Sequence, residues 1–186
     1  MKPKILGILS ALILVLCFSL PTLAGDSGTI TITMTGADEI SITLDKTNWD
    51  LGNVASNAVR ETIPPIEWCT LTVAGNCNVK TSIVGEDAKW VSNPTAYKWT
   101  LSNDGSSGQH IYGLWFRISG DTTRGPNVDG YVPVTKTQSE FWPYGSTGSS
   151  LAPGDKKQFG LRLVTPTYFY SGREMQAQVT ISAVAA

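Results

Sequence analysis

Histidine, cysteine and long apolar runs are scarce in this chain of 186 residues, and each scarcity excludes a class of function. The chain has one histidine, His110, and three cysteines, so it lacks the clustered Cys and His ligands of a zinc site. No Gly-x-Ser-x-Gly turn is present to offer a serine nucleophile to His110. The sequence therefore predicts a protein that is not an enzyme and holds no cofactor.

Acidic residues are scattered through predicted turns, without the Asp-x-Asp-x-Asp run of a calcium loop. Structural calcium between the loops of an extracellular domain is the one metal that this pattern leaves open. Charge is also nearly balanced: the first 24 residues hold two of the 14 basic residues, which leaves 12 against 15 acidic ones. Nucleic acids and anionic membranes usually select a basic patch, so neither is an expected partner.

Residues 1–24 have the pattern of a secretory signal peptide. Two lysines precede an apolar run over 5–20, and small residues stand at positions −3 and −1 before the expected cleavage after Ala24. A retained anchor is the alternative, although the run is short for a bilayer span, and Cys17 raises the possibility of lipidation. We expect a secreted or cell-surface protein with no membrane attachment after cleavage, and a single domain over 25–186.

Cys69 and Cys77 remain in the mature chain, and an oxidising compartment favours a disulfide between them. A simple hairpin turning at Gly75-Asn76 would place Cys69 opposite residue 82 and Cys77 opposite residue 74. In that arrangement Cys69 and Cys77 would be too far apart for a disulfide bridge. We predict an intrachain disulfide formed on a different connection; free thiols or pairing between chains are the alternatives.

Short runs of alternating apolar and polar residues dominate the mature chain, and none has a helical period. Leu161 and Val179 lie on the apolar faces of the last two runs and are predicted core residues. The apolar run 109–118 (QHIYGLWFRI) is expected to be a central strand. About nine or ten strands at regular spacing predict an all-β, two-sheet antiparallel sandwich, immunoglobulin-like or jelly-roll-like.

The run TITITMT at 29–35 alternates in the same way and follows the flexible stretch 25–28. It places Ile30, Ile32 and Met34 on one face. We expect it to be a strand that can complete the sheet of a neighbouring molecule.

Several motifs occur together over most of the mature chain: SITLDKTNWDLGNV (41–54), WCTLTVAGNCNVKTSIVGED (68–87), IYGLW (111–115), and the closing pair LAPGDKKQFGLRLVTPT and MQAQVTISA. In this order they resemble secreted prokaryotic Ig-like β-sandwich proteins of cell surfaces and extracellular matrices. More distantly, the chain resembles camelysin-type matrix fibre subunits, which share export, size and all-β architecture. The resemblance brings no catalytic motif and implies a structural or adhesive role.

Aromatic residues outside the clearest strand patterns are the best candidates for a contact site. Rings of this kind stack on sugars and anchor protein interfaces. The alternative is that they cover the ends of the sandwich core. The predicted contact patch consists of Tyr131, Phe141, Trp142, Tyr144, Tyr168 and Tyr170.

The function predicted from these features is that of an exported structural or adhesive surface protein, a subunit of an extracellular fibre, surface layer or biofilm matrix. Its expected partners are other copies of itself or cell-surface components. The alternative is a carbohydrate-binding β-sandwich module with a polysaccharide as its partner.

Overall fold

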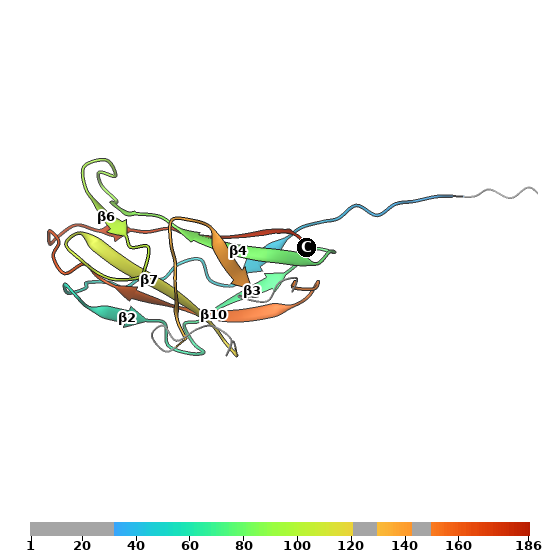
Figure 1. The fold of residues 1–186 in the computed structure, drawn as a ribbon, viewed down its shortest axis with the longest axis horizontal. Helices are drawn as coiled ribbons and strands as arrows, with labels where there is room; N and C mark the ends of the chain where they lie inside the picture. Colours follow the sequence, from blue (N-terminus) through green and yellow to red (C-terminus); the bar gives the residue numbers. More distant parts are fainter. Residues whose placement is uncertain (1–31, 121–129, 143–149) are drawn as a thin grey trace, which may run out of the picture. The chain divides into compact units, whose positions relative to one another are not determined.

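The structure is a computed structural model that describes residues 32–120, 130–142 and 150–186. The chain divides into two units, Met1–Gly36 and Ala37–Ala186. All of the strands named below belong to the second unit (Figure 1). The predicted signal peptide lies outside the described residues.

The described residues form twelve strands and no helix, which confirms the predicted all-β class. Two to three more strands are present than expected because several are only two or three residues long. The strands are β1 (Ile42–Leu44), β2 (Val59–Glu61), β3 (Cys69–Val73), β4 (Val79–Gly85), β5 (Ala88–Trp90), β6 (Lys98–Leu101), β7 (Ile111–Ile118), β8 (Val132–Pro133), β9 (Ser139–Trp142), β10 (Lys156–Val164), β11 (Met175–Gln176) and β12 (Val179–Ala185).

The strands form two sheets, as predicted for a sandwich. The large sheet has the order β1-β3-β10-β7-β6-β5-β11, with β2 paired to β10 and β8 paired to β7. The small sheet has the order β12-β4-β9. Figure 1 shows β10 and β7 running side by side in the large sheet, with β4 in the other layer. Strand β10 is the hub of the large sheet because it pairs with β2, β3 and β7.

The antiparallel prediction is wrong at one pair. Strand β6 is parallel to β7, with Thr100 opposite Ile111 and Leu101 opposite Tyr112. Parallel neighbours need a connection that returns the chain to its starting end. Residues 102–110 make this return, and they suffice because only two residue pairs are in register.

Strands β3 and β4 do not form the simple hairpin that the sequence also allowed. Strand β3 lies in the large sheet and β4 in the small one, so the turn between them crosses the sandwich. This turn is held by the segment before β1: the backbone N–H groups of Ala74 and Gly75 donate to the Ser41 carbonyl, and that of Asn76 donates to the Glu39 carbonyl. A side chain at Gly75 would collide with the Glu39 backbone.

The core lies between the sheets, and β7 runs through it. Residues 112–116 are all buried, so the predicted central strand is confirmed. Leu161 and Val179 pack against the core, but both are only partly buried. The fully buried large side chains are Tyr112, Phe116, Phe141, Leu71, Ile83, Leu101, Ile118, Leu151, Val73, Val79 and Val134.

The expected strand at 29–35 is not formed where the chain is described. Residues 32–35 have no strand pairing, and Ile32 and Met34 are 74% and 86% exposed. The described part of this segment therefore has the alternating pattern of a strand but is not paired in a sheet.

Asp87 ties the two sheets together at the point where the chain leaves β4 for β5. Its carboxylate accepts from the Lys136 and Lys98 ammonium groups at 2.9 and 3.1 Å and from the Leu101 N–H at 2.9 Å. Burial raises the pKa of Asp87, but these donors outweigh burial and hold the pKa at about 2, below its ordinary value of 3.8. The ionised carboxylate is therefore favoured by folding.

We expect this carboxylate to make stability depend on pH. Because folding lowers this pKa, the ionised carboxylate stabilises the folded protein fully above pH 3.8, and this stabilisation is lost as the pH falls through about 2. The difference between the unfolded and folded pKa values corresponds to about 2 kcal/mol in the free energy of unfolding. Urea denaturation from pH 6 to pH 2 should show Asp87→Asn less stable than the wild type at pH 6, with the difference closing towards pH 2. A difference that stays constant over this range would contradict the assignment.

Candidate functional site

The structure leaves Cys69 and Cys77 as free thiols, so the predicted disulfide is wrong. Cys69 begins β3, and its thiol donates to the Lys46 carbonyl; the Cys77 thiol lies beyond the other end of β3 and donates to the Glu39 carbonyl. An extended strand rises about 3.3 Å per residue, so β3 holds the two cysteines apart whether or not a hairpin follows. Desolvation by burial raises the pKa of the Cys69 thiol to about 11, which disfavours its nucleophilic thiolate form.

Alkylation should reveal both thiols. When the mature chain is treated with iodoacetamide in urea without reductant, we expect two added groups per molecule, at Cys69 and Cys77. Prior reduction should leave this number unchanged. A mass without added groups, shifting only after reduction, would restore the disulfide.

Two members of the predicted contact patch are core residues, and their assignment to an exposed surface is wrong. Tyr131 is 3% exposed and Phe141 is fully buried. The Phe141 ring stacks on Phe116 at 5.3 Å between centroids and meets Phe159 edge-on at 5.0 Å. Phe141 therefore joins the small sheet to the middle of the large one.

Trp142, another member of the predicted contact patch, is a strand residue. It ends β9, is half-buried, and packs against the core. The Lys157 ammonium lies over its ring, 4.4 Å from the centroid, and its carbonyl accepts from the Thr81 hydroxyl. Tyr144 lies outside the described residues.

Tyr168 and Tyr170 are exposed, at 52% and 49%, so these two members of the patch are available for contact. The residue between them, Phe169, points the other way and packs on Trp99 with ring centroids 4.9 Å apart. Backbone pairing fixes the segment further, since the His110 N–H donates to the Tyr168 carbonyl at 3.0 Å. A partly buried anchor thus presents two tyrosine rings at the surface.

Around these rings lies a group that we call the tyrosine–arginine cluster: Trp90, Tyr97, His110, Tyr168, Tyr170 and Arg173. His110 stacks on Tyr170 at 5.6 Å with an interplanar angle of 21°, and its Nδ1 is 2.7 Å from the Tyr97 hydroxyl. That hydroxyl also accepts from the Tyr170 N–H. His110 adopts a positive φ of 57° immediately before β7. This conformation is uncommon outside glycine and turns the ring into the cluster.

Sequence reasoning did not single out Arg173, Tyr97 or Trp90. They come from three separate parts of the chain, and only the pairing of β5 with β6 and β11 brings them together. An arginine two residues before a predicted strand carries no local signal of ring contact. The tyrosine-rich stretch 168–170 was the visible part of the cluster.

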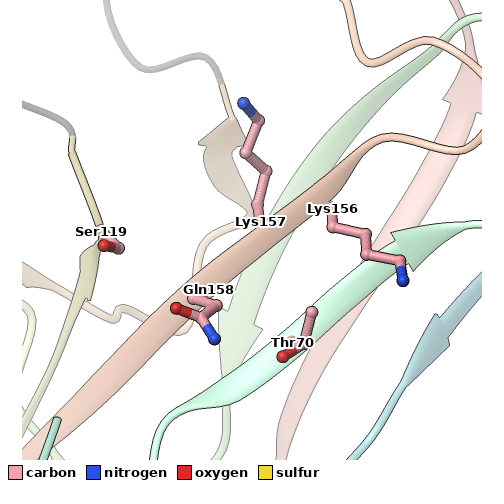
Figure 2. A pocket seen from close by; sticks show the side chains of 5 residues that line it. All are labelled: Thr70, Ser119, Lys156, Lys157 and Gln158. Carbon is pink, nitrogen blue, oxygen red and sulfur yellow. The ribbon is translucent and has the colours of Figure 1, made fainter. Parts of the chain in front are cut away.

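An open depression lies along β10, lined by Thr70, Ser119, Lys156, Lys157 and Gln158 (Figure 2). Its groups are two amines, two hydroxyls and an amide. Lys156 and Lys157 leave the strand on different sides (Figure 2), and Lys157 is engaged by Trp142. Among the described residues, no carboxylate or imidazole lines it, so these residues supply neither a general base nor an oriented nucleophile.

No group of three or more His, Cys, Asp or Glu side chains placed to hold a metal occurs in the described ranges. Within those same ranges, no helix is long and apolar enough to cross a membrane.

The chain matches no protein-family model and no curated protein. Its function must therefore be inferred from the geometry above.

Proposed function

We propose that this protein is an exported, non-enzymatic surface protein that assembles with copies of itself by strand addition. The observation that carries the proposal is the exposure of Ile32 and Met34, which alternate with threonines in a segment whose described residues, 32–35, pair with no strand. Exposed apolar side chains that gather on one face are a frequent feature of interaction sites. A strand added to a sheet edge buries such a row and satisfies the backbone at the same time.

The small sheet offers an edge of suitable length. Strand β12 pairs only with β4 among the described residues, which leaves its other edge open. Its core-facing residues Val179, Ile181 and Ala183 pack on the core but are only partly buried. A strand beside β12 would cover them.

The segment 29–35 fits this edge in length and spacing. It has seven residues, as β12 has. Ile30, Ile32 and Met34 repeat every second position, the same spacing as the three core-facing residues of β12. An open, regular edge also invites uncontrolled pairing, so a dedicated strand from a neighbour would both protect the edge and connect the subunits. The signal-peptide pattern of residues 1–24, the all-β fold and the resemblance to matrix proteins support a role in a fibre, surface layer or biofilm matrix.

The proposal is tested by placing charges on the apolar face of the segment. We expect the mature protein to form concentration-dependent polymers in size-exclusion chromatography and negative-stain electron microscopy. The double variant Ile32→Asp, Met34→Asp should stay monomeric, because an added strand would bury both charges. The matched control, Thr33→Asp with Thr35→Asp, places the same charges on the opposite face and should still polymerise.

Thermal melting should be the same for all three proteins as monomers, since Ile32 and Met34 are exposed. A wild-type protein that stays monomeric at every concentration would overturn the proposal. So would polymers that form equally well from the Ile32→Asp, Met34→Asp variant.

A further inference from the structure

The guanidinium of Arg173 is held by aromatic rings and by nothing else in the described part of the chain. Its central carbon lies 4.5 Å from the Tyr97 ring centroid, 4.7 Å from that of Tyr170 and 4.9 Å from that of Trp90. The backbone around it is fixed, because the Val91 N–H donates to the Glu174 carbonyl and β11 pairs with β5. The charge is therefore positioned before any partner arrives.

Several other cations near the sheets are paired with carboxylates. Arg162 contacts Glu61 at 3.3 Å, and Lys98 and Lys136 contact Asp87. Arg173, which is half-buried, has neither an ion pair nor a side-chain hydrogen bond within the described ranges. Ring contacts stabilise its charge but leave the planar N–H donors of the guanidinium without acceptors. These donors match a carboxylate, which arginine binds through two parallel hydrogen bonds.

The neighbouring rings suit the body of a sugar. Tyr168 and Tyr170 are half-exposed, and their ring centroids are 6.0 Å apart. The Phe169 anchor and the His110 stack hold them in place, so little side-chain freedom remains to be lost on binding. Each tyrosine presents an apolar face and a polar hydroxyl, the combination that packs on the C–H face of a pyranose while bonding its hydroxyls.

We propose that the tyrosine–arginine cluster is a binding site for a uronate-bearing polysaccharide. In this site Arg173 receives the sugar carboxylate and Tyr168 stacks on the pyranose ring. The Tyr170 ring is already engaged by His110 and Arg173, so it meets the sugar with its edge and hydroxyl. The site is independent of strand addition, because it uses β5, β6, β11 and the segment 168–173 and not the segment 29–35 or the edge of β12. An assembled subunit would thus carry an anchor for an acidic glycan.

Calorimetry with a matched pair of ligands tests the proposal. The mature wild-type protein is titrated with oligogalacturonate and with its methyl ester, in which the same sugar lacks the carboxylate charge. We expect the ester to bind at least about tenfold more weakly. Poly-glutamate serves as a third ligand, since it offers carboxylates without a pyranose ring, and it should also bind at least about tenfold more weakly.

Substitutions distinguish binding at the tyrosine–arginine cluster from nonspecific attraction of anions to the protein surface. Arg173→Gln should weaken oligogalacturonate binding at least about tenfold, and Arg173→Lys should weaken it as well, because an ammonium cannot make the paired hydrogen bonds. Tyr168→Ala should weaken it several-fold. Lys156→Gln removes the same charge from the depression on β10 and should leave the affinity within about twofold.

Absence of oligogalacturonate binding to the wild type would overturn the proposal. Equal losses in Arg173→Gln and Lys156→Gln would show nonspecific attraction instead, and equal binding of poly-glutamate would show that the partner is an acidic polypeptide. Melting curves of each variant check that the fold is intact. If Arg173→Gln fails to fold, the affinity of Tyr168→Ala and the comparison with the methyl ester still test whether the cluster binds the uronate. None of these results affects polymerisation, so failure here and failure of the proposed assembly are distinguishable.

Discussion

Replacing Phe141 by alanine is expected to lower the free energy of unfolding by about 3–5 kcal/mol, the usual cost of removing a large buried ring. The ring is fully buried and contacts Phe116 and Phe159, so its loss leaves a cavity between the two sheets. For a domain of this size the melting temperature should fall by about 6 °C or more. Differential scanning calorimetry of the mature protein measures this directly.

The matched control is Tyr168→Ala, which removes an aromatic ring of similar size from an exposed position. Its effect should stay within about 0.5 kcal/mol, as for most surface substitutions. If Phe141→Ala also stayed within that limit, Phe141 would be a surface residue, as its sequence context suggested, and the sandwich core would be assigned incorrectly.

The Gly113→Ala substitution is expected to cost about 3 kcal/mol, at the upper end of the range for overpacking. A Cβ at this position would lie 1.9 Å from the carbonyl oxygen of Gly105. The atom that the Cβ would meet belongs to the backbone, so it cannot move away by a change of side-chain rotamer. Gly105 in turn has a φ of +78° and lies against the Trp115 ring, whose indole N–H donates to the Gly105 carbonyl. The methyl group must therefore displace the 102–110 connection from β7.

Gly36→Ala is the control, since a Cβ there meets nothing within 4 Å and its φ is not positive. Urea denaturation should give the control the stability of the wild type. A Gly113→Ala variant as stable as the control would mean that the 102–110 connection does not lie on β7.

The positions of strands with a clear apolar run or a clear apolar–polar alternation could be predicted from the sequence. The run 109–118 is apolar on both faces, and β7 is indeed flanked by β10 and β6 and buried along its middle. The alternation around Leu161 and Val179 located β10 and β12 correctly. It did not reveal how deeply these residues are buried, because burial also depends on neighbours: in the part of the chain that the structure describes, β12 has a strand on only one side.

The stretch containing Phe141 and Trp142 shows what local sequence cannot supply. Consecutive aromatics before a proline show no alternation, so they looked like a loop. Whether such rings face inward depends on which strand lies opposite, and for Phe141 the partners Phe116 and Phe159 are distant in the sequence. The stretch around Gly75 is ambiguous for a related reason: both hairpin and sheet-crossing connections fit it, and only tertiary contact with Glu39 and Ser41 selects one. The disulfide prediction failed because strand β3 separates Cys69 from Cys77 whichever connection follows.

The position of β10 as hub has a consequence for the order in which the chain can fold. Its partners β2, β3 and β7 all precede it, and the register pairs Phe159 with Cys69 across 90 positions of sequence. Until strand β10 (Lys156–Val164) has been synthesised, no strand lies between β3 and β7, and the two halves of the large sheet cannot join. Topologies dominated by such distant pairings fold slowly, in milliseconds to seconds. A growing chain of this kind stays without its native sheet until it is nearly complete, the condition in which a polypeptide can be threaded across a membrane before it folds.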